Sequence, residues 1–212
     1  MKTTLFHIHD PMCSWCWAFK PTWEKIRAGL GDTVHQNVVG GLAPDSSEPM
    51  PADMQAMLQG NWQRIQQTVP GTEFNYDFWK TGKPRRSTYP SCRAVLCAAA
   101  QNPEFEEPMI TAIQHAYYLH AKNPSDKDVL IALAADIGCD VDQFAAQLDS
   151  AEIEEALQKE FMLVRQLGVR GFPSLVLLAG DELHGIQVDY NSAITSLDMI
   201  NVITDQKLNQ RA

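Results

Sequence analysis

Two cysteines separated by two residues are the part of this sequence best suited to chemistry. Cys13 and Cys16 lie in the segment Met12-Cys13-Ser14-Trp15-Cys16-Trp17. An apolar run over residues 5–8 precedes them, followed by the turn Asp10-Pro11, because the residue before a proline avoids helical geometry. A strand, a short turn and two thiols in this order indicate a site for thiol–disulfide exchange.

A helix is predicted to begin at this pair and to run from about Cys13 to Gly29. Its apolar positions are Trp17, Phe19, Trp23, Ile26 and Leu30. The first turn of a helix has unpaired backbone N–H groups and partial positive charge, which together stabilise a thiolate there. Three residues further is almost one turn, so the second sulfur can close a disulfide with the first. We therefore assign Cys13 as the attacking thiol and Cys16 as the more buried resolving thiol.

Two alternatives for the cysteine pair remain open at this point. His7 and His9 share one face of the preceding strand, so the pair could be half of a zinc site. Four ligands at one strand–helix junction would be crowded, however, and His7 would lie deep in the strand. The cysteines could also be inert core residues. We favour redox chemistry and expect no bound metal.

Composition and charge exclude several classes of protein. The 212 residues are 45% hydrophobic and 20% charged, as in an ordinary globular protein. The net charge of −9, from 17 basic and 26 acidic residues, argues against binding nucleic acid or an anionic membrane surface. No apolar run approaches the roughly 20 residues of a membrane-spanning helix.

The N-terminal residues and the cysteine count predict a cytoplasmic protein. The N-terminal apolar stretch is short and interrupted by histidine, unlike a signal peptide. Five cysteines, an odd number, fit poorly with a secreted disulfide framework. In the cytoplasm a dithiol is normally kept reduced, which favours a catalytic role for the cysteine pair.

The elements that must position the pair follow from hydrophobic periodicity. In chain order we expect strands over residues 3–9 and 34–42, mostly helix over 51–150, a long helix closed by Gly168, antiparallel strands over 175–178 and 183–188, and a terminal helix over 191–208. This order resembles a thioredoxin fold, an α/β fold, with a large inserted helical domain. We expect residues 1–48 and 151–212 to form the discontinuous thioredoxin-like domain and residues 49–150 the insertion.

Three features resemble the DsbA family, in particular its branch of FrnE-like proteins and predicted cytoplasmic protein-disulfide isomerases. The first is the run from Asp10 to Trp17, close to the Asp-x-x-Cys-x-Trp-Cys pattern of that branch. The second is Val169-Arg170-Gly171-Phe172-Pro173-Ser174, similar to the Gly-x-Pro element of the family. The third is the helical insertion, with Tyr117-Tyr118. The similarity covers nearly the whole chain.

The resemblance implies that Pro173 is cis and lies beside Cys13. The backbone of Phe172 would then be free to pair with an extended substrate strand, and we expect Gly171 and Trp15 to line the same substrate surface. The alternative is an ordinary trans-proline turn. Two residues depart from better-known members: Trp15 stands where the periplasmic oxidant has histidine, and Phe172 is larger than the usual valine or threonine.

Other residues carry weaker signals. Asp10 could accept a proton from Cys16 during exchange, although an Asp-Pro at a strand end is more often a turn. Cys92, Cys97 and Cys139 are expected to be buried spectators. The basic residues Lys80, Lys83, Arg85 and Arg86 could bind an acidic ligand such as glutathione, or form a solvated loop.

These features predict a thiol–disulfide oxidoreductase of the reductase or isomerase type, acting on protein or peptide thiols and disulfides. Apart from the redox pair we expect no cofactor, with glutathione as a candidate co-substrate. One alternative is a glutathione-dependent isomerase or transferase of the same fold. The other is a non-enzymatic adaptor that binds a partner protein through its helical domain.

Overall fold

A four-stranded sheet forms the base of the molecule. The computed structural model describes residues 3–209, with side chains to residue 206. The strands are β1 (Thr3–His9), β2 (Val34–Val39), β3 (Ser174–Ala179) and β4 (Glu182–Ile186), in the order β2-β1-β3-β4. β1 is parallel to β2 and antiparallel to β3, and β3 pairs with β4 as an antiparallel hairpin. The predicted β-α-β unit and C-terminal hairpin are confirmed.

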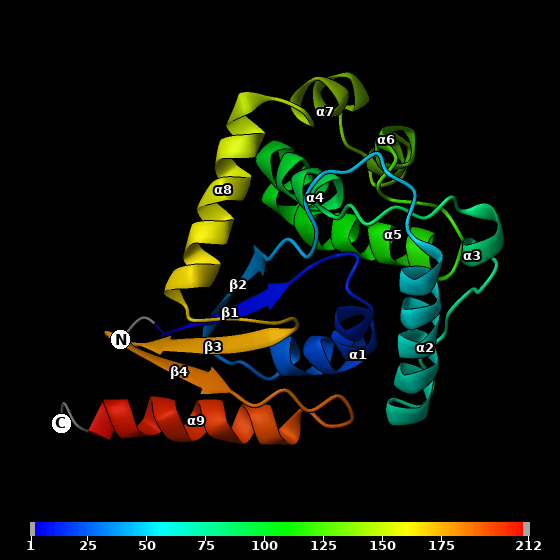
Figure 1. Ribbon diagram of the computed structural model, residues 1–212. Coiled ribbons are helices and arrows are strands. Elements are labelled where there is room, and N and C mark those ends of the chain that lie inside the picture. Colours follow the sequence, from blue (N-terminus) through cyan, green and yellow to red (C-terminus); the bar gives the residue numbers. More distant parts are fainter. Residues whose placement is uncertain (1–2, 210–212) are drawn as a thin grey trace.

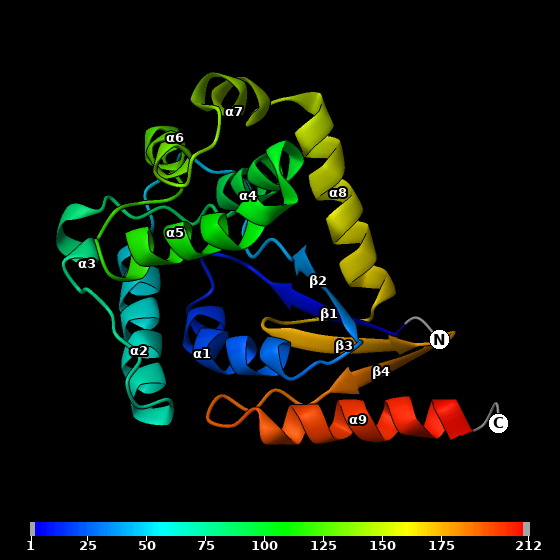
Figure 2. The same cartoon turned by 180° about the vertical axis from the view of Figure 1, so that it is seen from behind.

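Helices cover both faces of the sheet (Figures 1 and 2). On one face lie α1 (Ser14–Ala28), which connects β1 to β2, and α9 (Ile194–Asn209). On the other lies α8 (Ala151–Gln166). Successive side chains of a strand point to opposite faces, so Leu5 packs against α1 whereas Phe6 and Ile8 pack toward α8.

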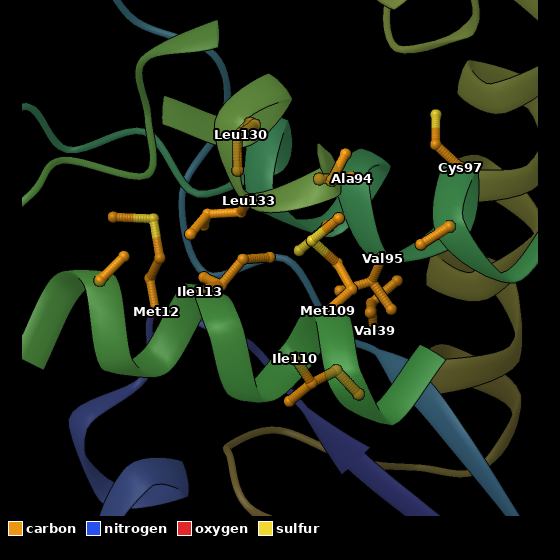
Figure 3. Packing of buried hydrophobic residues seen from close by; sticks show 14 of the residues in the cluster. Met12, Val39, Ala94, Val95, Cys97, Met109, Ile110, Ile113, Leu130 and Leu133 are labelled. Carbon is orange, nitrogen blue, oxygen red and sulfur yellow. The ribbon is translucent and has the colours of Figure 1, made fainter. Parts of the chain in front are cut away.

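The segment between β2 and α8 is mostly helical, as the sequence predicts. Its helices are α2 (Ala52–Thr68), α3 (Phe78–Thr81), α4 (Tyr89–Gln101), a 3-10 turn (Pro103–Phe105), α5 (Glu106–Tyr118), α6 (Lys127–Asp136) and α7 (Val141–Gln147). They enclose an apolar core that also includes Met12 and Val39 (Figure 3). Met12 belongs to the turn before the cysteines, and its side chain packs inside the helical core.

The helix α8 packs on both parts of the molecule. Ile153, Leu157 and Phe161 belong to the helical core, whereas Val164 packs on the sheet. The division into residues 1–48 with 151–212 and residues 49–150 stays a prediction, because one helix contributes to both cores.

β2 ends at Val39, three residues before the predicted end. The N–H of Gly40 still bonds to the carbonyl of His9 at 2.6 Å. The N–H of Leu42 instead donates to the Asp10 carboxylate at 2.7 Å, which turns the chain away from the sheet. This turn brings the end of β2 beside the cysteine pair.

Candidate active site

Cys13 and Cys16 lie at the start of α1, where the turn after β1 delivers them. Cys13 is the N-cap residue of the helix, and its Sγ accepts a hydrogen bond from the N–H of Cys16 at 3.3 Å. Both thiols are free, and the two residues are only 6% and 4% exposed. Exposure therefore does not separate their roles. The N–H bonded to Cys13 Sγ favours Cys13 as the attacking thiol, and the assignment of the two roles stays a prediction.

The loop before β3 lies against Cys13, 159 residues away in sequence. The Phe172–Pro173 bond is cis, as the resemblance implies. The Phe172 carbonyl oxygen lies 3.6 Å from Cys13 Sγ and accepts a hydrogen bond from the thiol. Pro173 is buried and Gly171 is exposed. The fold thus brings together the two motifs that the sequence singled out.

The ring of Phe172 packs against the end of β2. A Cβ on Gly40 would lie 2.1 Å from the Phe172 ring, so the ring occupies space left by the missing side chain. Trp15 lies elsewhere, half-buried against Tyr190, with ring centroids 5.1 Å apart. Of the expected substrate residues, Phe172 is the one whose backbone accepts a hydrogen bond from Cys13.

Asp10 is fully buried directly before the cysteine pair. Its Oδ1 accepts a hydrogen bond from the N–H of Met12 at 2.8 Å. Its Oδ2 accepts from Leu42 N and Thr88 Oγ1, both at 2.7 Å, and from Cys92 Sγ at 3.6 Å. Burial raises the pKa of the Asp10 carboxyl, while these hydrogen bonds act in the opposite direction. Both carboxyl oxygens of Asp10 thus accept hydrogen bonds from neighbouring residues of the fold. Acceptance of a proton from Cys16 by Asp10 stays a prediction.

Burial opposes the ionisation of Cys16, Cys92, Cys97 and Cys139. Burial, followed by the neighbouring Cys13, raises the pKa of the Cys16 thiol well above its ordinary range. Burial likewise raises the pKa values of Cys92 and Cys139, and it raises the pKa of Cys97 to about 12. Cys16 must therefore lose a tightly held proton before it can attack a disulfide.

The other candidate groups include the histidines and acidic residues that could hold a metal ion and the basic loop that could bind glutathione, whose binding stays a prediction. Among residues 3–209, no group of three or more His, Cys, Asp or Glu residues could hold a metal ion. In the basic loop, Arg85 pairs with Asp126 at 2.6 Å and Lys80 with Asp77 at 2.8 Å. The charges of these two residues are thus partly used within the fold.

Sequence reasoning missed the environment of His7 and His9. Their rings stack 5.0 Å apart behind the cysteine pair, and His7 bonds to Asn37 of β2. The alternation of β1 placed both on one face, but nothing in the sequence identified Asn37 as a partner.

A thioredoxin family model, described simply as Thioredoxin, matches residues 6–199 of this sequence. The chain belongs to this family. The match begins within β1 and ends in the first part of α9, so it covers the cysteine pair, the helical insertion and both motifs that meet at Cys13.

Solved structures support the same fold. A Nitrosomonas europaea protein, provisionally assigned as a protein disulfide isomerase, is 28% identical with a TM-score of 0.82, over 100% of both chains. The cytosolic disulfide reductase DsbM from Pseudomonas aeruginosa is 21% identical with a TM-score of 0.74, over 98% of this chain and 99% of its own. DsbM has also been solved with GSH. The fold is that of the DsbA-like oxidoreductases.

Curated relatives carry a different name. The ClpXP adapter protein SpxH of Halalkalibacterium halodurans is 26% identical over 172 residues, which is 79% of this chain and 56% of that protein. SpxH of Bacillus subtilis is 22% identical over 167 residues, 78% of this chain and 55% of its own length. The chain spans about half the length of the curated relatives it matches. Within residues 3–209, none of the helices has the length and apolar character needed to span a bilayer.

Proposed function

We propose that this protein is a thiol–disulfide oxidoreductase that acts as a reductase or isomerase of protein or peptide disulfides. The observation that carries the proposal is the placement of Cys13 Sγ between the N–H of Cys16 and the carbonyl of Phe172. The N–H of Cys16 can stabilise a thiolate at Cys13. The carbonyl of Phe172 is part of a backbone segment against which an extended substrate chain can pair. We further propose a cytoplasmic location, like that of DsbM.

The exchange proceeds in two steps. The Cys13 thiolate attacks one sulfur of the substrate disulfide and forms a mixed disulfide, while the other substrate sulfur leaves as a thiolate. Cys16 then loses its proton and attacks Cys13 Sγ. The Cys13–Cys16 disulfide forms, and the second substrate sulfur leaves as a thiolate. The substrate gains two electrons and the protein pair loses two, so an external thiol must reduce the pair before the next cycle.

Reduction of insulin by dithiothreitol tests the proposal, because the released B chain precipitates and scatters light. We expect the wild type to accelerate precipitation and Cys13→Ser to abolish the acceleration. Cys97→Ser is the matched control, since Cys97 is also a buried cysteine but lies in the helical core. Equal acceleration by wild type and Cys13→Ser would refute the redox assignment.

The SpxH relatives favour a second function, in which the helical insertion binds a partner protein without redox chemistry. Trapping distinguishes the two. With Cys16→Ala, an oxidoreductase accumulates mixed disulfides that reducing agent releases, whereas an adaptor retains its partner after reduction and also in Cys13→Ser. Transfer of glutathione by Cys16→Ser would instead indicate the glutathione-dependent alternative, for which the DsbM structure with GSH is the precedent.

A further inference from the structure

The strand β4 forms one edge of the sheet (Figure 1). It stands last in the order β2-β1-β3-β4 and pairs with β3 alone among the strands that the structure describes. An edge strand has backbone N–H and C=O groups without a ladder partner, and a further strand can pair with them. Proline and lysine, which commonly protect such an edge, are both missing from Glu182–Ile186.

A leucine and a glycine of β4 lie on the same face of the sheet. Leu183 pairs with Leu178 of β3 and Gly185 pairs with Val176, so both belong to the face on which α8 packs. Leu183 is nevertheless 48% exposed. A Cβ on Gly185 would meet no atom within 4 Å. The edge therefore presents an exposed apolar side chain and, at the next residue on the same face, an open space.

The open space at Gly185 is part of a groove with a volume of about 340 Å³. Its apolar lining includes Leu167 and Val169 from the segment after α8 and Val176 from β3. Arg170 lines the same groove. An apolar side chain that entered the groove beside Gly185 would be removed from water, which favours association.

A second copy of β4 in antiparallel orientation supplies such a side chain. When residue 184 lies on a twofold axis, Leu183 of each copy stands directly opposite Gly185 of the other. Directly opposite residues of antiparallel strands share one face and have Cβ positions about 4.5–5.5 Å apart. Each leucine then enters the space that the facing glycine leaves open, so the edge is complementary to itself, as a twofold interface requires.

The charges at the two ends of β4 match in the same arrangement. Asp181 is exposed in the turn before β4, and Arg170 is exposed at the groove that Gly185 and Val188 line beyond the middle of the strand. Antiparallel pairing places the turn of one copy beside the far end of β4 in the other copy. Asp181 of each copy then lies near Arg170 of the other. Such opposite charges favour this register, because a slip by one residue turns Leu183 to the other face.

We propose that β4 is a dimerisation edge, along which a second copy of this chain pairs antiparallel with Leu183 opposite Gly185 and Asp181 beside Arg170. The sheets of the two copies join into one continuous sheet. The turn at Asp181 of one copy then borders the loop of the other copy that carries Phe172 to Cys13. The second copy thus contributes to the surface beside the cysteine pair. The dimer does not depend on the thiol–disulfide exchange proposed above.

Analytical ultracentrifugation of the full chain tests the proposal, with excess dithiothreitol present to exclude intermolecular disulfides. We expect wild type to show a monomer–dimer equilibrium with a Kd of about 1–100 µM, because one short strand edge gives a small interface. Leu183→Ser removes the apolar side chain, and Gly185→Val fills the space opposite it without a clash in its own chain. Each should raise the Kd at least about tenfold. Val34→Ser is the matched control, since Val34 is 47% exposed on β2 at the opposite edge.

Asp181→Arg and Arg170→Asp test the antiparallel register. Each variant alone brings like charges together at both ends of the paired strands, so each should stay monomeric at concentrations where wild type dimerises. An equal mixture of the two should dimerise again, because both contacts between the copies then join opposite charges. No effect within a single chain can produce this recovery.

Three results would overturn the proposal. Wild type that remains a monomer at about 1 mM has no such dimer. A dimer whose Kd is unchanged in both Leu183→Ser and Gly185→Val uses another face. An equal mixture of Asp181→Arg and Arg170→Asp that stays monomeric refutes the antiparallel register, and this result stands even if Leu183→Ser fails to fold. Insulin reduction enters none of these measurements, so failure of the dimer and failure of the oxidoreductase assignment are distinguishable.

Discussion

The ring of Phe172 fills the space that a side chain on Gly40 would occupy. A Cβ on Gly40 would lie 2.1 Å from the ring, far inside van der Waals contact. The ring is thereby seated against the end of β2, while the carbonyl of the same residue faces Cys13 Sγ at 3.6 Å. The large residue before the cis-proline is accommodated because glycine stands opposite it.

Gly40→Ala should displace the loop that carries Phe172 and slow the reaction. A shift of about 1 Å in a reacting geometry can cost about 100-fold, so we expect insulin reduction to fall by about 10- to 100-fold. The double variant Gly40→Ala with Phe172→Ala removes the clash and should recover part of the loss. Gly60→Ala is the control, since a Cβ there meets no atom within 4 Å. Full activity of Gly40→Ala would contradict the packing described.

Met12→Ala should destabilise the protein, because its side chain is buried in the core of the helical insertion (Figure 3). Truncation of a buried methionine typically costs about 2–5 kcal/mol. Urea unfolding measures the loss. Met162→Ala, which removes a 46% exposed methionine from α8, should change the free energy of unfolding by less than about 0.5 kcal/mol. Similar losses in the two variants would refute the insertion of Met12.

The free energy of unfolding should fall as the pH rises toward neutrality, because of the buried carboxyl of Glu160. Its Oε2 accepts the N–H of Val39 at 3.0 Å, and burial is the main cause that raises its pKa to about 7. The folded state therefore holds a proton that the unfolded state releases above its ordinary pKa of 4.5, so stability falls between about pH 4.5 and pH 7. We expect a decline of about 1–3 kcal/mol from this group.

Glu160→Gln should flatten that part of the stability profile, since its amide oxygen can still accept from Val39. Chemical unfolding at several pH values provides the comparison. Glu152→Gln, an exposed residue of the same helix, is the control and should keep the wild-type slope. A Glu160→Gln profile parallel to that of wild type would show that the carboxyl does not titrate in this range.

Brief treatment with iodoacetamide should modify Cys13 before any other cysteine. Cys16, Cys92, Cys97 and Cys139 have pKa values raised by burial, and a protonated thiol reacts poorly. Mass spectrometry of peptides from the reduced protein locates the adduct, and Cys13→Ser should remain unmodified over the same time. Early modification of Cys92 in the helical core would contradict this order.

The sequence predicted the elements with strong local signals. The cysteine pair at a helix start, the parallel β1–β2 unit and the β3–β4 hairpin depend on spacing and periodicity, which neighbouring residues determine. The cis bond before Pro173 followed from the family resemblance. Two contacts could not be predicted: the hydrogen bond of His7 with Asn37, and the packing of the Phe172 ring against Gly40. Each joins residues from different elements, whose register is set only when the sheet forms.

The side chain of Asp10 restricts movement of the chain around the cysteine pair. It ties the turn before the cysteines to Leu42 and to Thr88 at the start of α4, so the helical part is fastened to the sheet at the reactive end. A hinged movement at this point would have to break the hydrogen bonds that the buried Asp10 side chain accepts. We therefore expect the backbone around Cys13 to keep its arrangement when a substrate approaches, so that it selects incoming chains by the shape that they already have.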